Sequence, residues 1–226
     1  MQAGQGRAKR ADKGYDPCDV ARTLSRIAEA LHPWVRVIEL RFDALDVASY
    51  VPRGREIRVP LAMKVATHSG VEALFESWPD SREEYERHHE VYYDYGFETW
   101  LIFHHIETGE PAHFQVLITH DDIPKVKRVL PWKLYDQIVD PHCAQRGWVY
   151  TFEKFRRMGV SLAATDLMVE YCRGRGIERV FGHRGFVNAA SLGMADQTGF
   201  VPFARVHQVQ LGRQRGHQGF YFRRPL

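Results

Sequence analysis

Cysteine is scarce in this chain of 226 residues, and long apolar runs are missing. The three cysteines, Cys18, Cys143 and Cys172, are far apart and form no CxxC pair, so we expect no disulfide framework. No stretch approaches the roughly 18 apolar residues of a membrane helix. The N-terminus lacks the apolar segment of a signal peptide. The sequence therefore predicts a cytoplasmic protein with no membrane segment.

Motifs of metal and nucleotide chemistry are also missing. The chain has no HExxH pair, no P-loop and no G-x-S-x-G elbow. Gly174-x-Gly176 follows a predicted helix, so it is not a dinucleotide-binding turn that follows a strand. The pairs His88-His89 and His104-His105 cannot easily share one ion, because adjacent side chains point in different directions. We therefore expect no metal.

Charge of one sign is missing from the end of the chain. The formal net charge is only +3, which is too small to favour a nucleic-acid binder. Residues 1–16 are basic and rich in Gly, Gln and Ala, and we expect a disordered tail there. No acidic residue follows Asp196, whereas five arginines do: Arg205, Arg213, Arg215, Arg223 and Arg224. This segment is either a solvated edge or a surface that faces an anion.

What the chain does contain is a core and regular patterning. Apolar residues make up 44% of it, enough for one large domain with extensions. The patterns predict helices at 19–31, 71–78, 81–95, 161–173 and 188–198. They predict strands at 34–42, 56–66, 99–105, 112–119, 148–152, 177–183, 201–211 and 219–223. The strand-helix-strand order from 148 to 183 implies two parallel strands with a right-handed crossover.

One segment of this pattern carries a chemical signal. From Phe152 to Leu162 a predicted strand runs into a basic turn, which contains Gly159 and leads directly into a helix. The first turn of a helix has unpaired N–H groups and the positive end of the dipole. Glycine lets a ligand approach the backbone closely. Together these features favour an anion site suited to a pyrophosphate.

The motif Arg156-x-x-Gly159-x-Ser161 resembles the Q/R-x-x-G-x-G/A signature of the GNAT superfamily of N-acyltransferases. A helix, a strand, the motif Asn188-x-x-Ser191 and the pair Gly199-Phe200 follow in the superfamily's order. The resemblance covers about 99–226. It divides the chain into a tail (1–16), an acceptor-side segment (17–98) and a coenzyme-binding core (99–226) with an insertion at 120–146.

The resemblance implies a fold and an activity. The fold would be α/β, with a mixed, mostly antiparallel sheet, a splayed parallel strand pair and flanking helices. The protein would move an acyl group, most simply acetyl, from coenzyme A to a primary amine by direct attack, with no metal. The acyl-coenzyme A would lie between strands 148–152 and 177–183. Its implied contacts are Thr151, Phe152, Arg156, Arg157, Met158, Gly159, Val160, Ser161, Leu162, Asn188 and Ser191.

Catalytic candidates are Glu153, His105 and Asn188. His105 or its neighbour would act as general base if it faces the site, because neutral histidine titrates near physiological pH. For Glu153, pairing with Arg156 or Lys154 on the surface is the favoured alternative. Many superfamily members have a tyrosine acid seven residues after the asparagine, where this chain has Ala195.

That departure keeps open a non-catalytic module that binds acyl-coenzyme A. A synthase that uses longer acyl chains is also open, because the chain is longer than a minimal domain of this superfamily. A weaker alternative is a nucleic-acid-associated protein that uses the basic tail and the arginine-rich C-terminus. The identity of the amine acceptor and the oligomeric state do not follow from the sequence.

Overall fold

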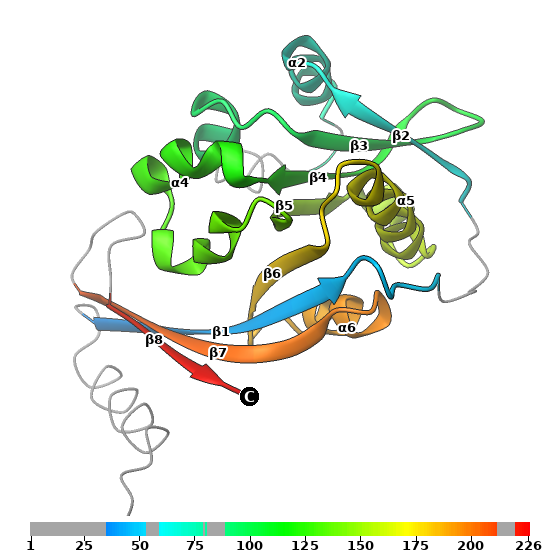
Figure 1. Ribbon diagram of the computed structural model, residues 1–226. Helices are drawn as coiled ribbons and strands as arrows, with labels where there is room; N and C mark the ends of the chain where they lie inside the picture. Colours follow the sequence, from blue (N-terminus) through cyan, green and yellow to red (C-terminus); the bar gives the residue numbers. More distant parts are fainter. Residues whose placement is uncertain (1–34, 53–58, 79, 81–88, 212–219) are drawn as a thin grey trace, which may run out of the picture.

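One mixed sheet of eight strands runs through the residues that the computed structural model describes, namely 35–52, 59–78, 80, 89–211 and 220–226. The predicted tail (1–16) and the predicted helix at 19–31 lie outside these residues. The sheet order is β2-β3-β4-β5-β6-β1-β7-β8 (Figure 1). The strands are β1 (Val35–Asp46), β2 (Leu61–Ala66), β3 (Trp100–His105), β4 (Pro111–Ile118), β5 (Cys143–Thr151), β6 (Arg179–Gly185), β7 (Val201–Leu211) and β8 (Phe220–Pro225).

Every neighbouring pair of strands is antiparallel except β5 and β6. These two run parallel and pair only over Cys143–Gln145 and Arg179–Phe181. Beyond that short contact β5 continues to Thr151 beside β4, while β6 continues to Gly185 beside β1. The two strands therefore part and leave a V-shaped opening, and the predicted fold class is confirmed.

A β-bulge in β5 lies at the start of this opening. Gln115 pairs with Val149, whereas Leu117 pairs with Arg146, so β5 has one extra residue at Gly147–Trp148. A bulge bends its strand and increases the local twist, which turns β5 away from β6. Sequence patterning placed the start of this strand at residue 148. Pairing with β4 and β6 shows that the strand begins at Cys143 instead. The sequence did not indicate residues 143–146 as strand, because they have no alternating apolar pattern.

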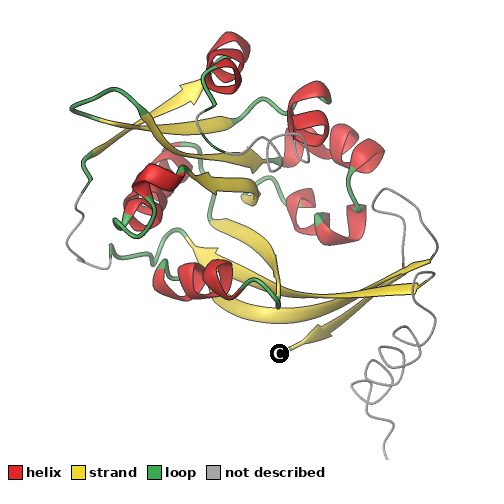
Figure 2. Cartoon of the chain, turned by 180° about the vertical axis from the view of Figure 1, so that it is seen from behind, coloured by secondary structure: helices red, strands yellow, loops and turns green. Residues whose placement is uncertain are grey.

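Helices cover the two faces of the sheet differently (Figure 2). On one face, α5 (Val160–Gly174) and α6 (Ala189–Gln197) bury apolar side chains against a cluster that includes Leu45 and Leu117. The opposite face packs against α2 (His68–Glu76), α4 (Ile123–Val129), the π-helix η1 (Glu90–Asp94) and the 3₁₀ turns η3 (Trp132–Leu134) and η4 (Asp136–Val139). Two further 3₁₀ turns are η2 (His120–Asp122) and η5 (Glu153–Phe155).

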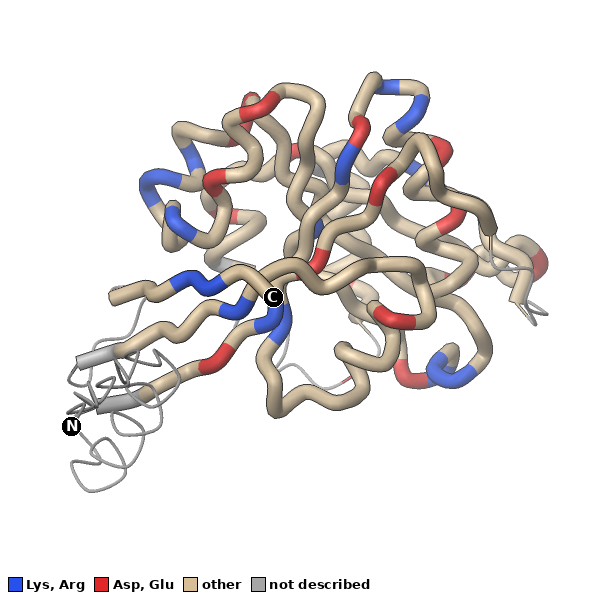
Figure 3. The backbone as a smooth tube through the Cα atoms, turned by 60° about the horizontal axis from the view of Figure 1, so that its bottom comes forward, with Lys and Arg blue, Asp and Glu red and all other residues tan. Residues whose placement is uncertain are grey.

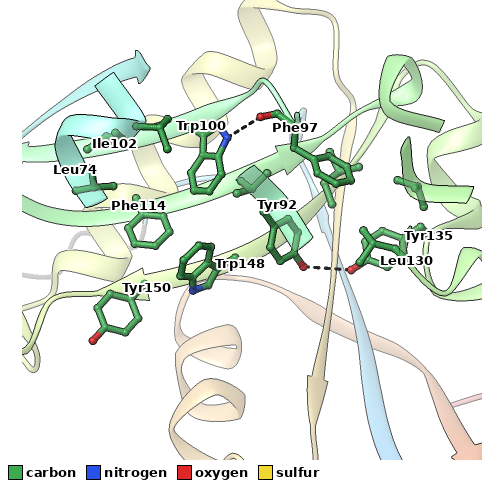
Figure 4. Close-up of a cluster of buried hydrophobic side chains, with 14 of the residues drawn as sticks. Leu74, Tyr92, Phe97, Trp100, Ile102, Phe114, Leu130, Tyr135, Trp148 and Tyr150 are labelled. Carbon is green, nitrogen blue, oxygen red and sulfur yellow. Dashed lines mark hydrogen bonds between the residues drawn. The ribbon is translucent and has the colours of Figure 1, made fainter. Parts of the chain in front are cut away.

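The face opposite α5 has an aromatic core. Trp148 lies among the rings of Phe114, Trp100 and Tyr92, with centroid distances of 4.9, 5.9 and 6.1 Å (Figure 4). The Trp100 indole donates to the Phe97 carbonyl at 2.7 Å, so its one polar group is satisfied inside the core. This packing fixes β3, β4 and β5 as a rigid wall on one side of the V-shaped opening.

The strands of the sheet come from more than one of the predicted divisions of the chain. β1 belongs to the segment 17–98, yet it lies between β6 and β7, so the sheet crosses the predicted boundary at residue 99. The predicted insertion at 120–146 ends at His142, because β5 begins at Cys143. Within it, α4, η3 and η4 pack on the sheet with Val126, Leu134 and Ile138 buried.

The arginine-rich C-terminal strands carry ion pairs. Arg205 lies 3.6 Å from Glu39 of β1, and Arg223 lies 2.9 Å from Asp136 of η4. Figure 3 shows lysine and arginine next to the C-terminus, with acidic residues on neighbouring segments. These contacts favour the solvated-edge interpretation for Arg205 and Arg223. Arg213 and Arg215 lie outside the described residues.

Candidate functional site

A cavity of about 560 Å³ opens where α5 begins. One wall is the end of β5 with the loop that follows it and the start of α5, and the other is one side of α6 from Ala189 to its C-cap Thr198. Its lining residues are Thr151, Phe155, Arg156, Arg157, Gly159, Val160, Ser161, Leu162, Ala189, Ala190, Gly193, Met194, Gln197 and Thr198. The cavity therefore lies in the V-shaped opening, on the side of α5 and α6.

The backbone at the mouth of the cavity is shaped by Gly159. It is the N-cap of α5 and has φ +78°, a left-handed conformation that glycine adopts without strain. The first helical residue follows directly, and a left-handed residue beside a right-handed one turns successive N–H groups toward one concavity. The N–H groups of Leu162 and Ala163 donate to the Gly159 carbonyl and form the first hydrogen bonds of the helix. The N–H groups of Val160 and Ser161 lie before these bonds, at the start of the helix.

Two hydroxyl groups on the cavity wall are linked to a buried histidine. His113 of β4 is 1% exposed, and its Nδ1 lies 2.7 Å from the Thr151 hydroxyl. That hydroxyl lies 3.2 Å from the Ser161 hydroxyl at the start of α5. Burial, with Arg146 nearby, lowers the pKa of His113 to about 3. His113 is therefore neutral at physiological pH and holds both hydroxyls in place.

At the narrow end of the opening, adjacent residues of β5 face opposite sides of the sheet. Gln145, the last residue paired in parallel with β6, hydrogen-bonds His183 Nδ1 at 2.8 Å. The His183 ring stacks on Phe42, whose side chain belongs to the aromatic core opposite α5. Arg146 points to the other face and donates to the Met194 sulfur of α6 at 3.7 Å.

Arg146 belongs to a buried group of charges. Asp43 is fully buried and pairs with both Arg184 and Arg41, the latter at 2.8 Å. Arg146 is 5% exposed and lies over the Phe200 ring at 4.4 Å, but within the described residues it has no carboxylate at ion-pair distance. Burial lowers the pKa of Arg146 well below its usual range, and Arg184 adds to this effect.

Most of the predicted coenzyme contacts line the cavity, and four do not. Thr151, Arg156, Arg157, Gly159, Val160, Ser161 and Leu162 are in the lining. Phe152 is 1% exposed in the aromatic core, where its N–H donates to the Ala112 carbonyl. Met158 is exposed outside the lining. Asn188 caps α6 through a bond from the Ser191 N–H at 3.0 Å, and these two residues flank the lining residues Ala189 and Ala190 in the chain.

The three predicted catalytic residues are not in hydrogen-bond contact with one another. His105 lies at the end of β3 beside Phe155, with Thr108 as its hydrogen-bond partner. Glu153 pairs with Arg156 at 3.2 Å, the surface pairing that the sequence favoured. Asn188 is the α6 cap. None of them lies at the narrow end of the opening beside Gln145. Their catalytic roles stay predictions.

Sequence reasoning missed His113, Arg146 and His183. His113 could have been noticed as a polar residue between Ala112 and Phe114 in a buried strand. Arg146 and His183 become neighbours of the opening only through the three-residue parallel contact, which no local pattern reveals. Ala195 is fully buried and packs with Phe200, so α6 has a core residue at the position where many superfamily members have a tyrosine acid.

Among the described residues, no helix is long and apolar enough to span a membrane. Nor do the described His, Cys, Asp and Glu side chains form a group of three that could hold a metal ion.

Solved structures share this architecture. No protein-family model and no curated protein matches the sequence. A GCN5-related glucosamine N-acetyltransferase region of a fungal multi-domain GH3 beta-N-acetylglucosaminidase is similar, with a TM-score of 0.56, 13% identity, and coverage of 86% of this chain and 23% of that chain. For a functionally unknown conserved protein from Staphylococcus epidermidis, the TM-score is 0.54, the identity 12%, and the coverage 84% of this chain and 67% of that one.

A Drosophila protein gives a TM-score of 0.51 at 12% identity, with 85% of this chain and 57% of that chain covered. This chain therefore spans about two thirds or less of each of these three solved chains. At such low identities, similarity to a solved structure is evidence of the fold alone. The structural similarity, the single parallel strand pair and the mostly antiparallel sheet together show that this chain has the fold of the GNAT superfamily, the GCN5-related N-acetyltransferases.

Proposed function

We propose that the protein binds an acyl-coenzyme A and transfers its acyl group, most simply acetyl, to a primary amine. The observation that carries this proposal is the cavity between the parted strands, with Gly159 in a left-handed conformation at the start of α5. A volume of about 560 Å³ is within the range of ligand sites. The fold of the solved relatives agrees with it.

The residues present fit such a ligand. The N–H groups of Val160 and Ser161, with Arg157 in the lining, suit the pyrophosphate. The hydroxyls of Thr151 and Ser161 add polar partners. The α6 wall includes the small residues Ala189, Ala190 and Gly193, and a Cβ added at Gly193 would meet no atom within 4 Å. A slender pantetheine arm therefore has room between β5 and α6.

The thioester of the bound coenzyme supplies an activated acyl carbon and a thiolate leaving group. The bulged stretch of β5 offers backbone N–H groups to the thioester carbonyl, an oxyanion-type contribution. His183 faces the opposite side of the sheet at the narrow end, where an amine would approach, and we assign it the role of proton acceptor. A thiol has a pKa of about 8.5, so the thiolate can leave without a tyrosine acid.

The buried Ala195 favours a second candidate, a module that binds acyl-coenzyme A without catalysis. The two candidates share the cavity and differ in what happens at its narrow end. Glu153, His105 and Asn188 remain catalytic candidates by prediction.

Thermal stabilisation by acetyl-coenzyme A, followed by thiol release across a panel of primary amines, tests the proposal. A ligand at 100 times its Kd should add about 2.7 kcal/mol to stability. Stabilisation with thiol release supports the transferase, and stabilisation without release supports the binding module. No stabilisation by coenzyme A or acetyl-coenzyme A would overturn both. The His183→Ala variant should lose thiol release and keep the stabilisation.

A further inference from the structure

Arg146 is a buried arginine that forms no ion pair with another described residue. It is 5% exposed, and its neighbour Arg184 already has Asp43 as a partner. Breaking a buried charge pair by removing one partner is strongly destabilising, because the remaining charge is uncompensated. Arg146 is in that state in the described structure, with only a thioether as hydrogen-bond acceptor. Among the described residues Asp43 acts on Arg146 electrostatically and opposes the lowering of its pKa by burial, but no carboxylate lies at ion-pair distance from the guanidinium.

The charged groups around Arg146 do not neutralise it, because Asp43 already pairs with two other arginines. Arg41, Arg146 and Arg184 are buried or nearly so, and Asp43 is the one fully buried carboxylate among them. Asp196 is 56% exposed and pairs with Arg41 on the outer side of α6. The Phe200 ring lies under both Arg146 and Arg184, at 4.4 and 5.1 Å. Positive charge is thus in excess at this point, with an aromatic face in place of a counter-ion.

One side chain, Met194, links Arg146 to the cavity. Met194 lines the cavity, and its sulfur accepts from Arg146 Nη2 at 3.7 Å. A thioether is a weak acceptor, and methionine has three rotatable bonds, so this side chain can be displaced at little cost. A carboxylate that entered from the cavity could replace the sulfur and form two parallel bonds with the guanidinium.

The position of Arg146 along β5 indicates which substrate would bring the carboxylate. Arg146 precedes Thr151 by five residues of the same strand, about 16 Å at roughly 3.3 Å per residue. An extended pantetheine arm from a phosphate site at Gly159 and Ser161 spans a comparable distance. Arg146 also faces α6, on the coenzyme side of the sheet, whereas His183 faces the other side. The anion therefore belongs to the acyl donor.

We propose that the donor is a coenzyme A thioester of a short dicarboxylic acid, and that Arg146 pairs with the free carboxylate of its acyl group. This proposal rests on the proposed function, because it assumes the coenzyme site at the start of α5. It adds the substrate class. A second carboxylate on the acyl chain neutralises the buried excess charge, and Met194 moves aside to admit it.

Binding measured by calorimetry tests the proposal without knowledge of the acceptor. The probes are succinyl- and glutaryl-coenzyme A, with butyryl- and valeryl-coenzyme A as uncharged chains of matched length. We expect the carboxylated thioesters to bind the wild-type protein roughly tenfold or more tightly, the factor that corresponds to about 1.4 kcal/mol. The Arg146→Met variant should lose that preference, and Arg146→Lys should retain part of it, because lysine keeps the charge without the planar fork.

Two controls separate the outcomes. Arg175→Met removes an exposed arginine at the end of α5 and should leave every Kd unchanged. Unchanged binding of free coenzyme A by Arg146→Met shows that this variant is folded, and its melting temperature should not fall, because a buried charge without a carboxylate is removed. Equal affinity for succinyl- and butyryl-coenzyme A in the wild type would overturn this inference alone. No binding of any coenzyme A species would overturn the proposed function as well.

Discussion

At the scale of single residues, Gly159 has the strictest requirement. Its φ of +78° is left-handed, and an added side chain would project beside the first N–H groups of α5. Left-handed backbone costs other L-residues roughly 1–2 kcal/mol. A negatively charged side chain at this position would repel an anion bound at the start of α5.

We expect Gly159→Glu to weaken coenzyme A binding about 100-fold or more, because a carboxylate beside a phosphate costs several kcal/mol. Isothermal titration with coenzyme A measures the change. Gly159→Ala reports the backbone strain alone, and Gly174→Glu places the same carboxylate at the far end of α5, where a Cβ meets open space. Equal affinities for Gly159→Glu and Gly174→Glu would mean that the phosphates bind elsewhere.

At the scale of elements, α6 depends on its cap. The Asn188 side chain accepts the Ser191 N–H at 3.0 Å and so satisfies one of the four unpaired donors of the helix start. Asn188→Ala should lower the free energy of unfolding by about 0.5–2 kcal/mol, measured by urea denaturation.

Asn188→Asp separates this structural role from the predicted coenzyme contact. Aspartate caps a helix as well as asparagine, so stability should be retained. If Asn188 also contacts the coenzyme, the added negative charge should weaken binding while stability holds. Unchanged affinity in Asn188→Asp would leave Asn188 as a cap alone.

The bulge in β5 is the second element with a sharp requirement. A Cβ at Gly147 would lie 3.0 Å from Tyr92 Cε1 and 3.2 Å from Ile118 Cδ1, both in the packed core. Gly147→Ala should therefore cost about 1–3 kcal/mol by overpacking. Gly193→Ala, whose added Cβ meets no neighbour, is the comparison and should raise the urea midpoint slightly, because alanine favours a helix interior over glycine by up to about 1 kcal/mol. An unchanged urea midpoint in Gly147→Ala would show that the bulge adapts.

The sequence predicted local elements better than their long-range pairing. The turn and helix from Arg156 to Arg173 were predictable because the signature residues are contiguous in the chain. β7 was predicted with its observed bounds, Val201–Leu211, because its apolar residues alternate between turn signals. The start of β5 was not predicted, since Cys143–Arg146 are strand only through partners in β4 and β6. For the same reason the site residues on those strands, Arg146 and His183, were missed.

At the scale of the whole molecule, stability should depend on pH through His113. Its pKa is about 3 in the folded protein and about 6.5 when unfolded. The unfolded chain therefore binds the proton first, and this contribution to stability is present above pH 6.5 and lost as pH falls toward 3. The loss at pH 5 should be about 2 kcal/mol.

Urea denaturation at pH 7.5 and pH 5 measures this loss, and His113→Asn should lack it. Exposed His142 is the comparison, since the Gly176 carbonyl raises its pKa and its protonation favours the folded state. Identical pH profiles for the wild type and His113→Asn would contradict the assignment of His113 as a buried neutral base.

The place of β1 in the sheet has a consequence for how the protein is made. β1 is the first described strand to leave the ribosome, yet both of its partners, β6 and β7, come from the last third of the chain. Leu40, for example, pairs with Gly185 and Val206. Until those residues are synthesised, both hydrogen-bonding edges of a 12-residue strand stay without their native partners. The nascent chain should therefore need protection from aggregation during most of its synthesis, and its folding should be slow for its size.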